Sequence, residues 1–311
     1  MRRYDALLFS GLWARDVFLS VPFLPLLALL GSLISLCLGT SFAKSLFPVL
    51  GPAGTSLLRI GFSMLILVLW WRPWRQRWSR QDLLPLLVYG FTLGAMNWLF
   101  YQAIGRIPFG LAIAIEFTGP LAVALWSSRR WLDGLWVVLA ASGLALILPW
   151  QGLDAPGALD TLGIVFALSA GACWALYIVI GQRVARRIGG MATPMGMVFA
   201  TLVVLPLGAM EALPALKDGA LLAAGLAVGL LSSAVPYTLE MYALRHLQRK
   251  TFSIFLSLEP AVGALAGWLV LSEALSAVQW LAMGLIMVAS AGSAGCSGKE
   301  APPDSGQKTS S

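Results

Sequence analysis

Charged residues are scarce in this sequence. Asp, Glu, Lys and Arg together make up 11% of 311 positions, whereas hydrophobic residues make up 59%. A soluble domain of ordinary composition carries about 25% charged residues. The shortage is also uneven, because long stretches almost free of charge alternate with short segments that hold most of it. The pattern therefore excludes an ordinary soluble domain and indicates membrane spans joined by short loops.

Residues that usually carry metal or nucleophilic chemistry are equally few. The sequence has one histidine, His246, and three cysteines, Cys37, Cys173 and Cys296, whose positions suggest neither a zinc site nor a disulfide framework. It also lacks the G-x-x-x-x-G-K-[ST] pattern, which excludes ATP hydrolysis through a P-loop. We therefore expect no metal, no cofactor and no enzymatic activity. The net charge of +7 comes from basic residues near span ends, so we interpret it as membrane topology and expect no nucleic-acid partner.

What the sequence does have is a series of apolar stretches. A helix needs about 20 mostly apolar residues to cross a bilayer. We predict an all-α membrane protein of ten transmembrane helices, at residues 22–43, 52–70, 83–104, 108–127, 132–149, 161–181, 193–212, 219–241, 251–271 and 276–294. Residues 295–311 are rich in Ser, Pro, Gly and Lys, and we predict a disordered cytoplasmic tail there.

The basic residues orient these spans. With the N-terminus in the cytoplasm, most Lys and Arg fall in cytoplasmic segments, and only Lys44, Arg106 and Lys217 fall on the periplasmic side. Nine or eleven spans would break this alternation partway along the chain. We interpret the basic N-terminal segment and the apolar run after Val21 as an uncleaved first span rather than a signal peptide. The expected location is the bacterial inner membrane, with both termini in the cytoplasm.

The two halves of the chain resemble one another weakly. A shift of 140 residues lays residues 97–126 over residues 237–266, and Pro120 then meets Pro260 inside the fourth and ninth predicted spans. Five spans per half is an odd number, so the second half must be inverted relative to the first. We predict two inverted five-helix repeats, at residues 22–149 and 161–294. In transporters with inverted repeats the substrate binds near the membrane midplane, between the repeats.

Ionisable side chains inside predicted spans are the first candidates for a site, because charge in hydrocarbon is costly. Glu116 lies in the fourth span and Glu259 in the ninth, each close to a proline that loosens the helix. Either carboxylate could hold a substrate ammonium group or titrate with a proton; alternatively, each could accept bonds from a neighbouring helix and only fix packing. Arg59, in the second span, could bind a substrate carboxylate, pair with one of these glutamates, or extend towards the interface.

Polar and aromatic residues add candidates for a cavity wall. Asn97 and Tyr101 are four residues apart on the third span, Tyr237 overlays Asn97 in the repeat, and Trp174 and Tyr177 lie three apart on the sixth span. Such side chains could line a substrate cavity or make ordinary interhelical hydrogen bonds.

Two charged residues lie near span ends and are candidates for gating. Lys44 closes the first span near the periplasm, where an interfacial anchor is the alternative role. Glu240 lies near the cytoplasmic end of the eighth span, where gating and simple solvation are both open.

Four stretches resemble a known family: residues 43–48 (AKSLFP), 112–130 (AIAIEFTGPLAVALWSSRR), 170–177 (AGACWALY) and 232–241 (SSAVPYTLEM). The chain resembles the EamA-type branch of the drug/metabolite transporter superfamily and, within it, the bacterial exporters of threonine and homoserine. The likeness runs along nearly the whole chain except the tail. It implies ten helices in two inverted halves and export of small amino acids driven by the proton gradient. It does not assign binding residues.

The resulting hypothesis is alternating access in the lipid bilayer, with protons and a small amino acid as partners. The ammonium group of the substrate would meet Glu116 or Glu259, and its carboxylate would meet Arg59 or donors such as Asn97 and Tyr101. Alternatives are an EamA-type exporter of another metabolite or a drug, and a non-transporting membrane protein such as an embedded enzyme or a scaffold. A homodimer is a further arrangement that the sequence leaves open.

Overall fold

The computed structural model describes residues 23–76, 78–127, 133–147, 159–188, 191–247 and 249–296. Throughout these ranges the regular structure is helical, with no strand. The basic N-terminal segment and residues 297–311 of the predicted tail lie outside the described residues. The last helix, α14 (Ala277–Cys296), runs two residues into the segment predicted as tail.

In the described part of the chain, seven helical stretches are long and apolar enough to cross a membrane. They are α2 (Phe23–Ser45), α3 (Phe47–Trp71), α4 (Arg80–Ile104), α8 (Thr161–Ile188), α9 (Ala192–Lys217), the continuous run α10 (Gly219–Gly229), η3 (Leu230–Ala234) and α11 (Val235–His246), and the apolar part of α12 (Arg249–Leu256) with α13 (Glu259–Leu271). Shorter apolar helical stretches comprise α5 (Phe109–Glu116) with α6 (Thr118–Ser127), α7 (Asp133–Ile147) and α14. Each predicted span coincides with one of these stretches.

Several of these stretches are broken in the middle. The helix of the fourth predicted span is interrupted at Phe117, between α5 and α6, and that of the ninth at residues 257–258, between α12 and α13. A proline follows each break, and proline has no N–H to donate to the preceding turn. The run from α10 to α11 contains a π-helical turn, η3, immediately before Pro236. Gly51 interrupts α3 with a φ of 60°, a conformation that favours glycine.

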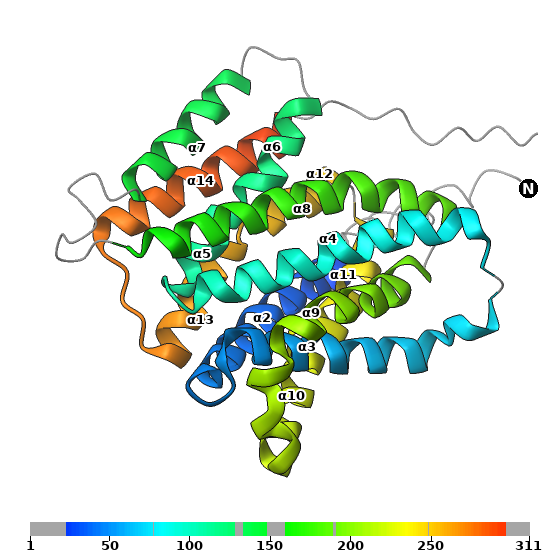
Figure 1. The fold of residues 1–311 in the computed structure, drawn as a ribbon. Helices are drawn as coiled ribbons and strands as arrows, with labels where there is room; N and C mark the ends of the chain where they lie inside the picture. The colour runs from blue at the N-terminus through cyan, green and yellow to red at the C-terminus, as the bar shows by residue number, and fades with distance from the viewer. Residues whose placement is uncertain are drawn as a thin grey trace, which may run out of the picture.

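The helices pair in a regular way (Figure 1). α3 packs along α9, and α4 packs on both α8 and α9. The run α10–η3–α11 packs in the same manner on α2 and α3. α5 crosses α13, and α7 lies beside α14 at one edge of the bundle. The helices of the first predicted half therefore contact mainly helices of the second.

Apolar side chains face outwards and polar ones face inwards. Trp126, Trp70 and Met210 are 92%, 82% and 78% exposed, whereas Arg59 and Asn97 are buried. A soluble protein rarely exposes so much contiguous apolar surface, and a membrane protein presents such a surface to lipid. The distribution indicates a multi-pass membrane protein whose apolar core also contains buried polar residues.

Close helix contacts surround the break at Phe117. A Cβ atom on Gly119 would lie 1.9 Å from the carbonyl oxygen of Gly171, and one on Gly171 would lie 2.6 Å from the carbonyl oxygen of Glu116. Only glycine allows α8 to approach the broken helix this closely. These contacts fix the backbone on which Glu116 lies.

Candidate functional site

Arg59 of α3 is buried among hydrogen-bond acceptors from two other helical stretches. Its Nη1 donates to Asn97 Oδ1 at 2.9 Å, its Nη2 to the carbonyl oxygen of Ser232 at 3.0 Å, and its Nε to Ser233 Oγ at 3.2 Å. Asn97 Nδ2 in turn donates to the carbonyl oxygen of Leu93, so the amide oxygen faces the guanidinium. The serines lie in the π-helical turn η3, a type of helix irregularity that often occurs at functional sites.

The guanidinium also lies over the ring of Tyr101, 5.4 Å from its centroid, in a cation–π arrangement. Asn97 and Tyr101 therefore contact Arg59 from the same face of α4, as their spacing predicts. No carboxylate oxygen of the described chain lies within 4.0 Å of Arg59. The described residues therefore show no ion pair of Arg59 with Glu116 or Glu259, which was one of the alternatives left open by the sequence. The hydrogen-bond acceptors around Arg59 in the described chain are all neutral.

Glu116 and Glu259 lie at the two helix breaks. Glu116 is the last residue of α5 and Glu259 the first of α13, and they are 7% and 8% exposed. Within the described ranges, neither carboxylate takes part in a hydrogen bond or an ion pair. The alternative that each glutamate accepts bonds from a neighbouring helix therefore finds no partner there. The two carboxylates interact electrostatically with Arg59, and Glu116 also interacts with Glu259.

Glu240 and the tyrosines extend this cluster. Glu240 accepts a hydrogen bond from Ser32 Oγ at 3.1 Å and interacts electrostatically with Glu259. Tyr237 lies within electrostatic reach of Arg59, Glu240 and Glu259. We call Arg59, Asn97, Tyr101, Glu116, Tyr237, Glu240 and Glu259 the central cluster.

Two further predicted residues lie at the edge of the central cluster. Tyr177 accepts a hydrogen bond from the hydroxyl of Tyr89 at 2.9 Å, and their rings are stacked with centroids 5.0 Å apart. Trp174 packs edge-on against Phe117, with ring centroids 5.3 Å apart, and so covers the break beside Glu116. Both side chains are half-buried on α8.

Lys44 lies away from the central cluster, at the end of α2. Its Nζ donates to Glu273 Oε1 at 2.5 Å and to the carbonyl oxygen of Ile107 at 3.1 Å. Glu273 Oε2 accepts the backbone N–H of Phe109 at 2.7 Å, so it also caps α5. Lys44 thus joins the two predicted halves instead of extending towards the interface.

Sequence reasoning missed a second carboxylate that acts in this way. Glu211 of α9 accepts the backbone N–H groups of Ala53 and Gly54, at 2.8 and 2.9 Å, and so caps the part of α3 that restarts after the break at Gly51. Glu211 falls within the predicted seventh span, so its placement in an apolar run was a signal that could have found it. The serines of η3 were signalled only by their position before Pro236.

A third carboxylate that caps a helix lies at the start of α8. Arg106 Nη1 donates to Asp160 Oδ2 at 3.1 Å, and Asp160 Oδ1 accepts the N–H of Leu162 at 2.8 Å, which caps α8. The hydrogen bond from Arg106 lowers the pKa of Asp160 below its ordinary value, and the backbone amides of α8 lower it further. Both side chains are about two-fifths exposed, so solvent screens the pair.

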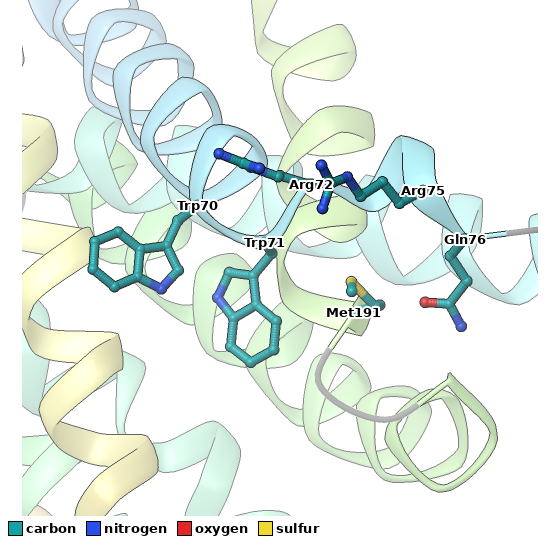
Figure 2. A pocket seen from close by; sticks show the side chains of 6 residues that line it. All are labelled: Trp70, Trp71, Arg72, Arg75, Gln76 and Met191. Carbon is teal, nitrogen blue, oxygen red and sulfur yellow. The ribbon is translucent and has the colours of Figure 1, made fainter.

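A surface hollow of about 620 Å³ lies at the C-terminal end of α3 (Figure 2). It is lined by Trp70, Trp71, Arg72, Arg75, Gln76 and Met191. Arg72 is thirteen residues beyond Arg59 along α3, which corresponds to roughly 20 Å. The hollow is therefore separate from the central cluster.

Membrane helices that are interrupted beside buried ionisable side chains are an arrangement typical of membrane transporters. The model of the EamA-like transporter family matches residues 161–294. The chain is 47% identical over 270 residues to the threonine/homoserine exporter RhtA of Escherichia coli K12, which covers 87% of this chain and 91% of that protein, and RhtA of Salmonella typhimurium gives the same values. The protein belongs to the EamA-like transporter family.

More distant similarities agree with this family. The uncharacterized inner membrane transporter YedA of Escherichia coli K12 is 29% identical over 194 residues, covering 59% of this chain and 61% of that protein. A crystal structure with 23% sequence identity superposes with a TM-score of 0.50 and covers 88% of this chain and 96% of the other. At that identity the superposition shows a shared fold.

Proposed function

We propose that this protein exports L-threonine, L-homoserine and related small amino acids across the bacterial inner membrane. The name and the 47% identity of the threonine/homoserine exporters support the substrate class. The observation that carries the proposal is the charge pattern of the central cluster. Among the described residues, the buried Arg59 guanidinium has no ion-pair partner and the buried Glu116 and Glu259 carboxyl groups have no hydrogen-bond or ion-pair partner. Such groups are complementary to the carboxylate and the ammonium group of a zwitterionic amino acid.

In the proposed binding mode, Arg59 receives the substrate carboxylate, with Asn97 and Tyr101 beside it. Its five N–H donors make three hydrogen bonds to the protein, so donors remain for a further acceptor. Glu116 or Glu259 receives the ammonium group. The hydroxyl groups of threonine and homoserine would then lie among the polar side chains of α4 and η3.

We further propose that the helical stretches form ten spans in two inverted halves, with both termini in the cytoplasm. Two observations support this arrangement. Under the shift of 140 residues, the break at Phe117 corresponds to residue 257, where α12 ends and α13 is about to begin. The packing of α4 on α8 and α9 is repeated by the packing of α10–η3–α11 on α2 and α3, which is the exchange that a two-fold axis between the halves requires.

Export is proposed to run by proton-driven alternating access. A proton that enters from the periplasm would neutralise Glu116 or Glu259, remove the attraction for the ammonium group and release the substrate outwards. The carboxylates are suited to this step because no hydrogen bond or ion pair in the described part of the chain competes for them. The contacts of Lys44 and Glu273 would hold the periplasmic side closed until release.

Counterflow into proteoliposomes tests the proposal. Vesicles loaded with unlabelled threonine should accumulate labelled threonine, and a panel of the twenty amino acids plus homoserine should rank threonine and homoserine first. Glu116→Gln and Glu259→Gln remove one ionisable group each without changing its size, and at least one should abolish the pH dependence of transport. Asp218→Asn is the matched control, because Asp218 only caps α10 outside the central cluster.

Three results would contradict parts of the proposal. If neither glutamine variant differed from the wild type across pH, the glutamates would have no part in proton coupling. If the wild type moved drugs or another metabolite but no amino acid, the substrate assignment would be wrong while the family remained. A protein active on no solute would indicate a non-transporting role.

A further inference from the structure

The hollow at the end of α3 combines indole and guanidinium side chains. Trp70 and Trp71 bring two indole rings to one side of it, and Arg72 and Arg75 bring two guanidinium groups (Figure 2). In the described part of the chain, neither guanidinium makes a hydrogen bond or an ion pair with the protein. By contrast, Arg59, Arg106 and Arg187 all have acceptors.

The local backbone produces this grouping. Arg72 ends α3 in the left-handed conformation, with a φ of 50° and a ψ of 56°, and Pro73 then starts the short helix η1 (Pro73–Arg75). The chain therefore turns sharply between Trp71 and Arg75. Beyond the turn, Arg72 and Arg75 line the same hollow as Trp70 and Trp71, and Met191, at the start of α9, lines it as well.

The residue types indicate the depth of the hollow in the membrane. Tryptophan rings concentrate at the level of the lipid head groups, where one edge is apolar and the other is wet. Trp70 is 82% exposed and Trp74, which follows Pro73, is 59% exposed, so these rings face the surroundings rather than the protein core. Guanidinium groups at this level bind phosphate oxygens in a two-pronged contact.

The geometry points to a binding site for an anionic phospholipid of the cytoplasmic leaflet, with the phosphate held by Arg72 and Arg75 and the glycerol region against Trp70 and Trp71. The leaflet assignment rests on the proposed orientation of the chain. Because the site spans the end of α3 and the start of α9, a bound lipid would connect the two helices that carry Arg59 and Glu211. The lipid would thus stabilise the α3–α9 pair at its cytoplasmic end.

Lipid binding to the purified full-length protein tests this assignment without any transport measurement. Protein stripped of lipid in detergent is titrated with phosphatidylglycerol, phosphatidylcholine or inorganic phosphate. Bound lipid is counted by native mass spectrometry, and the melting temperature is followed in parallel. The variants are Arg72→Gln and Arg75→Gln. Arg183→Gln is the control, because Arg183 is an exposed arginine on the same predicted side that does not line the hollow.

The wild type should retain phosphatidylglycerol in preference to phosphatidylcholine. Each hollow variant should bind phosphatidylglycerol about fivefold more weakly, whereas Arg183→Gln should bind it like the wild type. Two separate substitutions guard against the case in which one of them misfolds, which the melting temperature without lipid would reveal.

Equal retention of the two lipids by the wild type would overturn the inference, and so would equal effects of all three substitutions. Stabilisation by inorganic phosphate as strong as that by phosphatidylglycerol would mean a site for free anions rather than for lipid. Failure of amino-acid counterflow together with intact, Arg72-dependent lipid binding would remove the proposed transport function alone.

Discussion

Replacing Asn97 by aspartate tests whether Arg59 is reserved for a substrate carboxylate. The two side chains have nearly the same shape, so Oδ1 of the new residue would remain near 2.9 Å from Arg59 Nη1. The substitution changes a neutral acceptor into a permanent counter-ion. If the guanidinium binds the substrate carboxylate, the new carboxylate would neutralise Arg59 in its place without adding bulk to the side chain.

The magnitude follows from this distance. At an effective dielectric constant of about 20, two unit charges 2.9 Å apart attract with roughly 6 kcal/mol. Burying the new carboxylate costs several kcal/mol, and losing the bond from Asn97 Nδ2 to the carbonyl oxygen of Leu93 costs about 1 kcal/mol. These contributions nearly cancel, so we expect the variant to fold and to melt within a few degrees of the wild type.

Transport should respond very differently from stability. A substrate carboxylate would meet an already neutralised Arg59, and losing only about 1.4 kcal/mol of that attraction weakens binding tenfold. We therefore expect the concentration for half-maximal threonine counterflow to rise at least tenfold in Asn97→Asp. Asn97→Ala is the control, because it removes the same hydrogen bond without adding charge and should have a smaller effect on this concentration.

The reasoning would be refuted if Asn97→Asp bound threonine as well as the wild type while remaining folded. Arg59 would then be a structural residue that fixes α3 to α4 and η3. If Asn97→Asp fails to fold, two single variants take its place: Asn97→Ala, and Arg59→Lys. The lysine keeps the positive charge but loses the planar arrangement of donors. If neither of those changed the concentration dependence, the binding role would be excluded as well.

Three further substitutions test individual contacts. Glu211→Ala removes the acceptor of two backbone amides of α3 and should lower the free energy of unfolding by about 1–2 kcal/mol, seen as a lower melting temperature in detergent. Gly171→Ala should lower the free energy of unfolding by about 1–3 kcal/mol, because its new Cβ would lie 2.6 Å from a carbonyl oxygen. Gly284→Ala is the control and should not destabilise the protein, because a Cβ there meets no atom within 4 Å. Equal melting temperatures of the two variants would contradict the close approach at Gly171. For Asp160, the lowered pKa means that its ion pair with Arg106 is fully formed above the ordinary value near 3.9 and is lost as the pH falls below it. Asp160→Asn should therefore leave the pH profile of transport between pH 5 and 8 unchanged, and an altered profile would show that this pair takes part in proton coupling.

Much of the architecture could be predicted because it depends on local sequence. Hydrophobic run length located the helical stretches, and helical spacing placed Asn97 and Tyr101 on one face of their helix; that this face contacts Arg59 is a finding of the structure. The cost of burying charge singled out Glu116 and Glu259, both of which lie at helix breaks. In each case one physical rule, applied within a single helix, was sufficient.

The remaining parts of the site depend on contacts between distant positions. Ser233 is 174 residues from Arg59, and the π-helical turn that presents it is not specified by periodicity. The capping of Ala53 by Glu211 joins positions 158 residues apart. The ion pair of Lys44 with Glu273 joins positions 229 residues apart. The sequence around Lys44 gives no sign of this partner, so it suggests only gating or an interfacial anchor. Composition and spacing within one helix do not indicate which other helix packs against it.

These distant contacts have one property in common, which bears on how such a protein can change conformation. The polar contacts of Lys44 with Glu273 and of Glu211 with α3 join the first predicted half to the second at the predicted periplasmic end. Arg187 with Asp82, and Ser32 with Glu240, do the same at the predicted cytoplasmic end. An alternating-access cycle must break one set while it keeps the other. Apolar contacts accompany these polar ones, for example Leu86 and Tyr89 against Val184 and Ala192 at the predicted cytoplasmic end. Opening one end therefore has to separate both kinds of contact, and the differential binding of substrate and proton to the two conformations must supply that free energy.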